Sequence, residues 1–268
     1  HYPLRRQRQM CIRDRSKDCA GVWSLAGKRG AEKPTRVWDR VERVYDNSHW
    51  ELFRTLRVKA HAVMRALVEE QISSMVHGSV ARGDVDSYSD VDVVIPYVVP
   101  SHRVEVSLGI RGFDLYSRRI AQATPSHAPK AHIYLDSQER VSVTFPLLNL
   151  RSLELEFFKF GGLIDIGLLK NEARVPGCTK RLTLIEPTLQ GHIESPVIGH
   201  ETEVAEKVGV SVDIVKERTR VLTRRDKIGR TGIFQLTELK KDETFERALK
   251  RLVDTNPAVR RIYLSRVN

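Results

Sequence analysis

The sequence contains few cysteines and no long apolar segment. Its three cysteines, Cys11, Cys19 and Cys178, have neither paired nor metal-ligand spacing, which argues against a disulfide scaffold and against structural zinc. No run approaches the roughly 18 uncharged apolar residues that a membrane-spanning helix requires. No apolar stretch of the signal-peptide kind follows the basic N-terminus. These absences predict a cytoplasmic protein with no membrane partner.

The positive charge is unevenly distributed along the chain. Residues 1–17 hold six basic residues and one acid, and therefore carry +5 of the net charge of +11. Their stretch QMCIRDRS resembles translated sequencing-adaptor read-through, so we expect roughly the first 16 residues to be non-native. The remaining +6 favours a polyanionic partner or substrate but does not require one.

Composition shifts along the chain predict four segments. Residues 1–37 are a disordered or non-native lead-in, and residues 38–160 form a mixed α+β domain. Residues 161–198 are a turn-rich connector that either is partly ordered or forms strands over the active site. Residues 199–268 form a helix-turn-helix or winged-helix-like domain.

Periodicity supports the α+β assignment. Apolar residues recur at three- and four-residue steps from about Trp38 to Glu70, which predicts a helix. The stretches SSMVHGS and DVDVVIPYV predict two strands, and residues 101–112 predict a helix closed by Gly112. Three further strands are expected in DLYSRRIAQA, AHIYLD and VSVTFPL. This order predicts a mixed sheet with flanking helices.

The C-terminal segment reads as two short helices. Gly209 is expected at the turn of HETEVAEKVGVSVDIVKERTRVL, and Ser211 is expected to cap the second helix. The basic segment TRRDKIGRTGIFQL is predicted to form a wing, and an amphipathic helix from about Asp242 to Val253 follows. Two interpretations stay open: contact with nucleic acid through residues 199–234, or a helical domain that packs on the first one.

The stretch VHGSVARGDVDSYSDVDVVI carries the chemistry. Asp90 and Asp92 alternate with Val91 and Val93, so on a strand both carboxylates share one face while the valines face the core. The two carboxylates would repel each other unless a cation lies between them. Mg²⁺ prefers oxygen ligands and completes its shell with phosphates and water, so the pair indicates a bound nucleoside triphosphate.

A second element supplies the phosphate contacts. Gly78 directly after a strand permits close approach of the backbone to a phosphate, and Ser79 adds a hydroxyl donor. Arg82 is expected to cover phosphate charge from the same side. Ser126, His127, Lys130 and His132 in TPSHAPKAH are further candidates for phosphate or acceptor contact, although a solvated loop is the alternative.

HGSVARGD followed by SDVDVVI resembles the nucleotidyltransferase superfamily related to DNA polymerase beta. From about Trp38 onward, the chain also resembles a group of archaeal predicted nucleotidyltransferases. The resemblance implies that Asp90 and Asp92 hold Mg²⁺ against an NTP, with ATP as first choice, and that an acceptor attacks the α-phosphorus with release of pyrophosphate.

The superfamily normally has a third carboxylate on a later strand. Here Ser142 stands in VSVTF where an acid is expected, so Asp136 is the first candidate for this role and Asp165 the second.

Two rival functions stay open. One is a non-catalytic, nucleotide-sensing DNA-binding regulator, and the other is an interaction module that binds neither Mg²⁺ nor nucleotide. The acceptor and the oligomeric state are left open as well.

Overall fold

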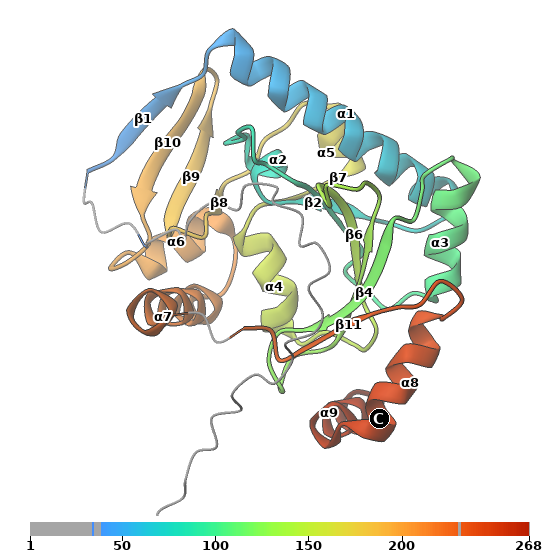
Figure 1. Cartoon of the computed structure of the whole chain (residues 1–268). Helices are drawn as coiled ribbons and strands as arrows, with labels where there is room; N and C mark the ends of the chain where they lie inside the picture. Colours follow the sequence, from blue (N-terminus) through green and yellow to red (C-terminus); the bar gives the residue numbers. More distant parts are fainter. Residues whose placement is uncertain (1–33, 35–38, 230–231, 268) are drawn as a thin grey trace, which may run out of the picture.

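The computed structural model describes residues 34, 39–229 and 232–267, so nearly all of the lead-in predicted over residues 1–37 lies outside the described residues. Two sheets organise the described part of the chain (Figure 1). The large sheet contains β2 (Met75–His77), β3 (Val91–Val94), β4 (Ser117–Gln122), β5 (Lys130–Tyr134), β6 (Val141–Pro146), β7 (Leu163–Asp165) and β11 (Gln235–Glu238). Their order across the sheet is β11-β4-β5-β6-β3-β2-β7. The β3–β6 pair is parallel and the other neighbours are antiparallel, which confirms the predicted mixed sheet.

One face of the large sheet is covered by helices. They are α1 (Asn47–Glu69), α3 (Ser101–Ile110), α5 (Ile166–Lys170), α8 (Phe245–Thr255) and α9 (Pro257–Val267). These helices share one hydrophobic core with the inward-facing strand residues, including Phe53, Met64, Val91, Val93, Phe145 and Phe245. Burial of this apolar surface packs one face of the sheet against the helices, and the polar residues of the strands lie on the opposite face.

Several local signals in the sequence are confirmed. The α1 helix begins after Asp46, whose carboxylate accepts a hydrogen bond from the His49 backbone N–H at 2.8 Å. It begins later than the sequence predicts, because residues 41–44 form a strand. The α3 helix ends at Ile110, and Gly112 follows with a φ of 77°.

The small sheet lies beside the large one. It contains β1 (Val41–Val44), β8 (Gly177–Cys178), β9 (Thr183–Thr188) and β10 (Gly191–Pro196), in the order β1-β10-β9-β8. The helices α4 (Ser152–Phe160), α6 (Glu201–Val208) and α7 (Val212–Ile228) pack with it around a second core that includes Phe160, Leu184, Val204 and Ile214. The segment predicted as a connector over residues 161–198 therefore holds most of a sheet, as the alternative of strands over the active site supposed.

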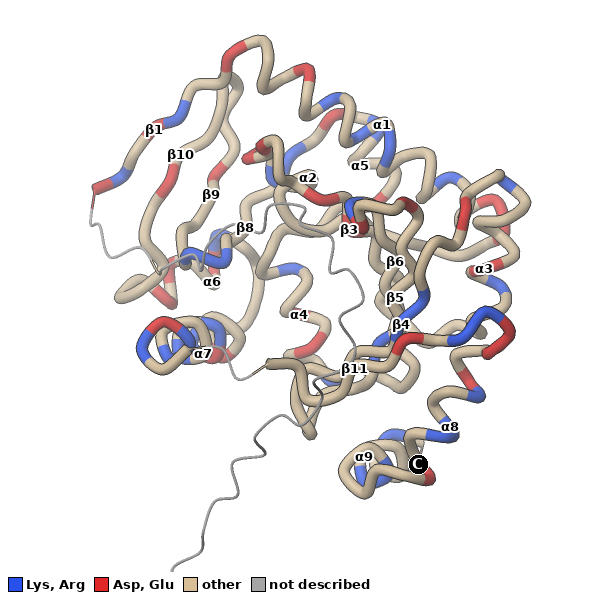
Figure 2. Tube along the Cα trace, viewed as in Figure 1, with Lys and Arg blue, Asp and Glu red and all other residues tan. Residues whose placement is uncertain are grey.

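The C-terminal region differs from the winged-helix prediction. The helix pair is present, with Gly209 at a φ of 71° and the Ser211 hydroxyl accepting a hydrogen bond from the Ile214 N–H. No wing forms within the described residues, because α7 continues to Ile228 and β11 pairs with β4 of the large sheet. Figure 2 shows charges of both signs along α7. Within this region, α6 and α7 pack in the second core, whereas β11 joins the large sheet.

None of the helices in the described residues combines the length and apolar character that a membrane crossing needs.

Candidate active site

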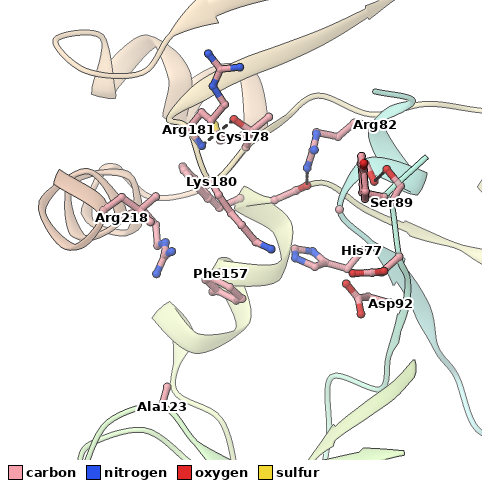
Figure 3. Close-up of a pocket in the computed structure, with 18 of the residues that line it drawn as sticks. His77, Arg82, Ser89, Asp92, Ala123, Phe157, Cys178, Lys180, Arg181 and Arg218 are labelled. Atoms are coloured by element: carbon pink, nitrogen blue, oxygen red, sulfur yellow. Dashed lines mark hydrogen bonds between the residues drawn. The ribbon is translucent and has the colours of Figure 1, made fainter. Parts of the chain in front are cut away.

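A large cleft opens on the polar face of the large sheet. Its volume is about 3180 Å³, and its walls come from the large sheet, the small sheet, α4 and α7. Gly78, Ser79, Asp90 and Asp92 line it, so the structure brings together the two motifs that the sequence singled out. Figure 3 shows Asp92 and His77 on one side of this cleft and Arg218 on the other.

The two aspartates have the arrangement expected of a cation site. Val91 and Val93 are fully buried in the core, and Asp92 points from the same strand into the cleft. Burial and then the charge of Asp92 raise the pKa of Asp90, while Arg140, with its Nε 4.0 Å from Asp90 Oδ1, lowers it. Two carboxylates that repel each other beside open space form an oxygen-only donor set, which fits Mg²⁺.

Ser142 occupies the position of a third carboxylate. In the parallel pair of β3 and β6, Ser142 lies directly beside Asp92, and its hydroxyl donates a 2.9 Å hydrogen bond to Asp92 Oδ1. Among the described residues, no group of three His, Cys, Asp or Glu side chains is arranged to hold a metal ion. The strand neighbour of Asp92 therefore orients that carboxylate and adds no negative charge.

Both sequence candidates for the third carboxylate have backbone partners of their own, although the charge of Asp136 also raises the pKa of Asp90. Asp136 accepts hydrogen bonds from the backbone N–H groups of Gln138, Arg140 and Val141, and thereby closes the turn between β5 and β6. Asp165 caps α5 by accepting from the Leu168 N–H at 2.8 Å. Neither residue lines the cleft. Both carboxylates satisfy local backbone donors, which explains why acids occur at these positions.

The Gly78-Ser79 loop is built as the sequence predicts. Gly78 has φ 84° and ψ −144°, a conformation that only glycine adopts without strain, and a Cβ placed on it would meet nothing within 4 Å. Conformation therefore requires glycine here, and the space beside its Cα stays open. The Ser79 hydroxyl lines the cleft and lies 3.2 Å from the Ser89 hydroxyl.

Arg82 lines the cleft, as the sequence predicts, and its side chain is held by groups of the protein. Its guanidinium is 7% exposed and donates two hydrogen bonds to the carboxylate of Asp84, at 2.9 and 2.8 Å. A third bond goes to the carbonyl of Gly161. These bonds join the α2 (Ser79–Arg82) loop to the chain before β7, and contact between Arg82 and a phosphate stays a prediction.

Lys180 is a second cation near the aspartates, in addition to Arg140. It lies in the loop between β8 and β9, lines the cleft, and lowers the pKa of Asp90 through its charge. In Figure 3 its amine points toward His77, whereas Arg181 points away. Sequence reasoning missed Lys180 because its segment was interpreted as a connector, although the Lys180-Arg181 pair in GCTKRL was a visible basic signal.

Two neutral histidines lie on the floor of the cleft. Burial is the main cause that lowers the pKa of His77 and of His132 to about 4 each. His77 Nδ1 lies 2.9 Å from the carbonyl of Phe158, so Nδ1 carries the proton and Nε2 is an acceptor. His132 Nδ1 lies 2.9 Å from the Thr144 hydroxyl. His132, Lys130, His127 and Ser126 of TPSHAPKAH all line the cleft, which agrees with the contact interpretation of that segment.

Comparison with known families identifies the central part of the chain. Residues 62–143 match the family model of the nucleotidyltransferase domain, and this range contains Gly78, Ser79, Asp90 and Asp92. Comparisons with the curated proteins and with the solved structures find no match. Residues 62–143 are therefore a nucleotidyltransferase domain of the polymerase-beta-like kind.

Proposed function

We propose that the protein is a Mg²⁺-dependent enzyme that transfers a nucleoside monophosphate from an NTP, with ATP as first choice, to an acceptor. The observation that carries this proposal is the pair of Asp90 and Asp92 facing the open side of the Gly78-Ser79 loop across one cleft. The acceptor would attack the α-phosphorus, a new P–O bond would form, the bond between the α- and β-phosphates would break, and pyrophosphate would leave.

The chain's own residues would bind and orient the donor. Gly78 leaves room for a phosphate beside its backbone, and Ser79 offers a hydroxyl donor. Lys180 would neutralise triphosphate charge, and Arg82, which also lines the cleft, stays a candidate for the same role. Ser142 would hold Asp92 in one orientation through its hydrogen bond.

Asp90 and Asp92 would hold the cation. When bound, Mg²⁺ would stabilise the negative charge that develops on the transferred phosphoryl group.

The regulator alternative is not favoured. The second helix of its proposed DNA-binding unit, α7, lines the cleft with Arg218, Arg220 and Arg225. A helix in this position would contact an acceptor that enters the cleft. Contact with nucleic acid through residues 199–234 is therefore proposed only for an acceptor in the cleft. A cytoplasmic location, where NTPs are abundant, completes the proposal.

The test is transfer of label from α-³²P-labelled NTPs to RNA, DNA, protein and small-molecule fractions of a cell extract. The wild type is compared with Asp90→Asn/Asp92→Asn and with Asp114→Asn, which removes an exposed carboxylate outside the cleft. We expect Mg²⁺-dependent labelling and pyrophosphate release by the wild type and by Asp114→Asn, and neither by the double variant. Equal labelling by all three proteins would contradict the proposal.

A further inference from the structure

The cleft contains two cations that the donor site does not use. Lys130 on β5 lies over the rings of Phe157 and Phe158, with its Nζ 5.6 and 4.4 Å from their centroids. Arg218 on α7 lies over the Phe157 ring, with its Cζ 4.9 Å from the centroid. Lys130, Phe157 and Arg218 line the cleft together, and we call these three residues the Phe157 site.

Neither cation of the Phe157 site has an anionic partner. Among the described residues, neither makes an ion pair or a hydrogen bond, and Arg218 Nε is buried without any acceptor. Burial is the main cause that lowers the pKa of Lys130, and that lowers the pKa of Arg218 to about 10, so Arg218 remains charged at neutral pH. Cations that are removed from water and left unpaired destabilise a fold, and contact with an aromatic ring offsets only part of the cost.

The nearby carboxylates Glu154 and Glu217 act through their charge on Lys130 and Arg218 respectively, but among the described residues neither makes an ion pair with these cations. Glu154 is engaged with Arg266 at 2.8 Å, with the Ala128 N–H and with the Arg151 N–H. Glu217 lies next to Arg218 in the chain and acts on it only through its charge. The unpaired cations therefore point to a ligand from outside the protein.

We propose that the Phe157 site binds a phosphate group of the acceptor. A phosphate ester carries up to two negative charges and several acceptor oxygens, which suits two cations that approach from different elements, whereas a carboxylate would neutralise only one. In Figure 3, His77 and Lys180 lie between Arg218 and Asp92. The ring of His77, the strand partner of Asp92, lies 5.9 Å from the ring of Phe157, so the Phe157 site adjoins the aspartate pair across His77. The assignment to the acceptor rests on the proposed function, whereas the assignment of phosphate binding rests on the cations themselves.

Calorimetric titration of the full chain without Mg²⁺ tests this inference. The background variant is Asp90→Asn/Asp92→Asn, so that binding is measured independently of transfer. Phenyl phosphate is the probe, and benzoate is its carboxylate match. Arg218→Met and Lys130→Met each remove one cation, and Arg224→Met removes an exposed charge from the same helix outside the cleft.

We expect phenyl phosphate to bind at least tenfold more tightly than benzoate. Each of Arg218→Met and Lys130→Met should weaken it about tenfold or more, because each removes a charge-assisted contact, and Arg224→Met should leave it unchanged. Equal weakening by Arg224→Met, or benzoate binding as tight as that of phenyl phosphate, would overturn the inference. The dinucleotide ApA distinguishes the sources: Arg218-dependent binding of ApA indicates a nucleic-acid acceptor, and binding of the monoester alone indicates a small phosphorylated one.

Thermal denaturation supplies a second readout. Because Arg218→Met removes an unpaired, partly buried charge, this variant should be at least as stable as the background variant without ligand. A clear loss of stability would show that Arg218 is a structural residue and would refute its assignment to a ligand site. If the phosphate results hold but the double aspartate variant still transfers label, the proposed function fails and the binding site stands.

Discussion

Replacement of Ser142 by aspartate would create the carboxylate that the nucleotidyltransferase resemblance leads one to expect. The new side chain would stand on β6 beside Asp92, where the Ser142 hydroxyl now lies 2.9 Å from Asp92 Oδ1. Two carboxylates about 4 Å apart repel by roughly 4 kcal/mol at the effective dielectric constant of a protein site, which is about 20. Protonation of one carboxylate limits this cost. Keeping a carboxyl group neutral near pH 7 requires its pKa to rise by about 3 units, which corresponds to roughly 4 kcal/mol. Without metal, Ser142→Asp should therefore lose about 3–4 kcal/mol of stability.

The assay is thermal denaturation at pH 7.5 in EDTA and in excess Mg²⁺. A loss of this size corresponds to a Tm about 6–15 °C lower for a chain of this length. Ser142→Asn is the control, since asparagine has nearly the same shape as aspartate, can still donate a hydrogen bond to Asp92 and adds no charge. Excess Mg²⁺ should restore the Tm of Ser142→Asp most of the way to the wild-type value, because the cation binds the folded state and neutralises the carboxylates. If both variants melt together in EDTA, or if Mg²⁺ does not narrow the gap, the placement of Ser142 at a metal-facing position is refuted.

Three further predictions concern residues that support the cleft. Arg82→Met should lower the free energy of unfolding by about 3–5 kcal/mol in urea denaturation, because Asp84, whose side chain is 14% exposed, is left without its cationic partner. An unchanged urea midpoint would show that this ion pair is dispensable for stability. His132 has a folded pKa of about 4 against 6.5 in the unfolded chain, so stability should fall as the pH drops from 6.5 to 4. Between pH 7 and 4.5, the free energy of unfolding of His132→Gln should fall by about 2 kcal/mol less than that of the wild type. Parallel plots of unfolding free energy against pH for the two proteins would contradict this. Gly177→Ala should lower the free energy of unfolding by about 1–3 kcal/mol in urea denaturation, because the new Cβ would lie 2.5 Å from the Gly162 backbone nitrogen. No loss of stability would mean that the backbone segments of Gly177 and Gly162 separate easily.

Local patterns predicted that Gly78, Ser79, Asp90 and Asp92 lie together in one cleft, because these residues are close in sequence. The alternation of Asp90 and Asp92 with Val91 and Val93 fixes which face each side chain takes, whatever the rest of the chain does. The conformation of Gly78 likewise follows from its place between a strand and a helix.

The opposite wall of the cleft was not predictable in this way. Lys180 and Arg218 reach it from segments far along the chain, and no local period shows that they meet Phe157 or Asp90. The ion pair of Arg82 with Asp84 was not predicted either. Gly83, with a φ of 107°, turns the chain so that Asp84 faces the guanidinium, and that turn is invisible in the residue types.

Two structural elements were hidden by ambiguous patterns. The sequence predicted residues 41–44 as part of a long helix. Four residues of which two are charged fit the helical and the strand periodicity equally well, and only pairing with β10 makes them a strand. The first part of the segment predicted as a wing, residues 223–228, continues α7, because Arg, Lys and Asp are tolerated in a helix, and the helix ends before Gly229.

The pairing of β1 with β10 has a consequence for biosynthesis. The two strands are separated by roughly 150 residues, so at ribosomal rates β1 waits roughly 8–30 s for its partner to be made. During that interval its backbone donors and acceptors are unpaired, and the β4 edge of the large sheet still lacks β11. The nascent chain thus carries two open strand edges until late in translation. Expression of residues 62–143 alone, which lack β1 and β11, would leave the β4 edge open, and chains that extend through β11 should be markedly less prone to aggregation.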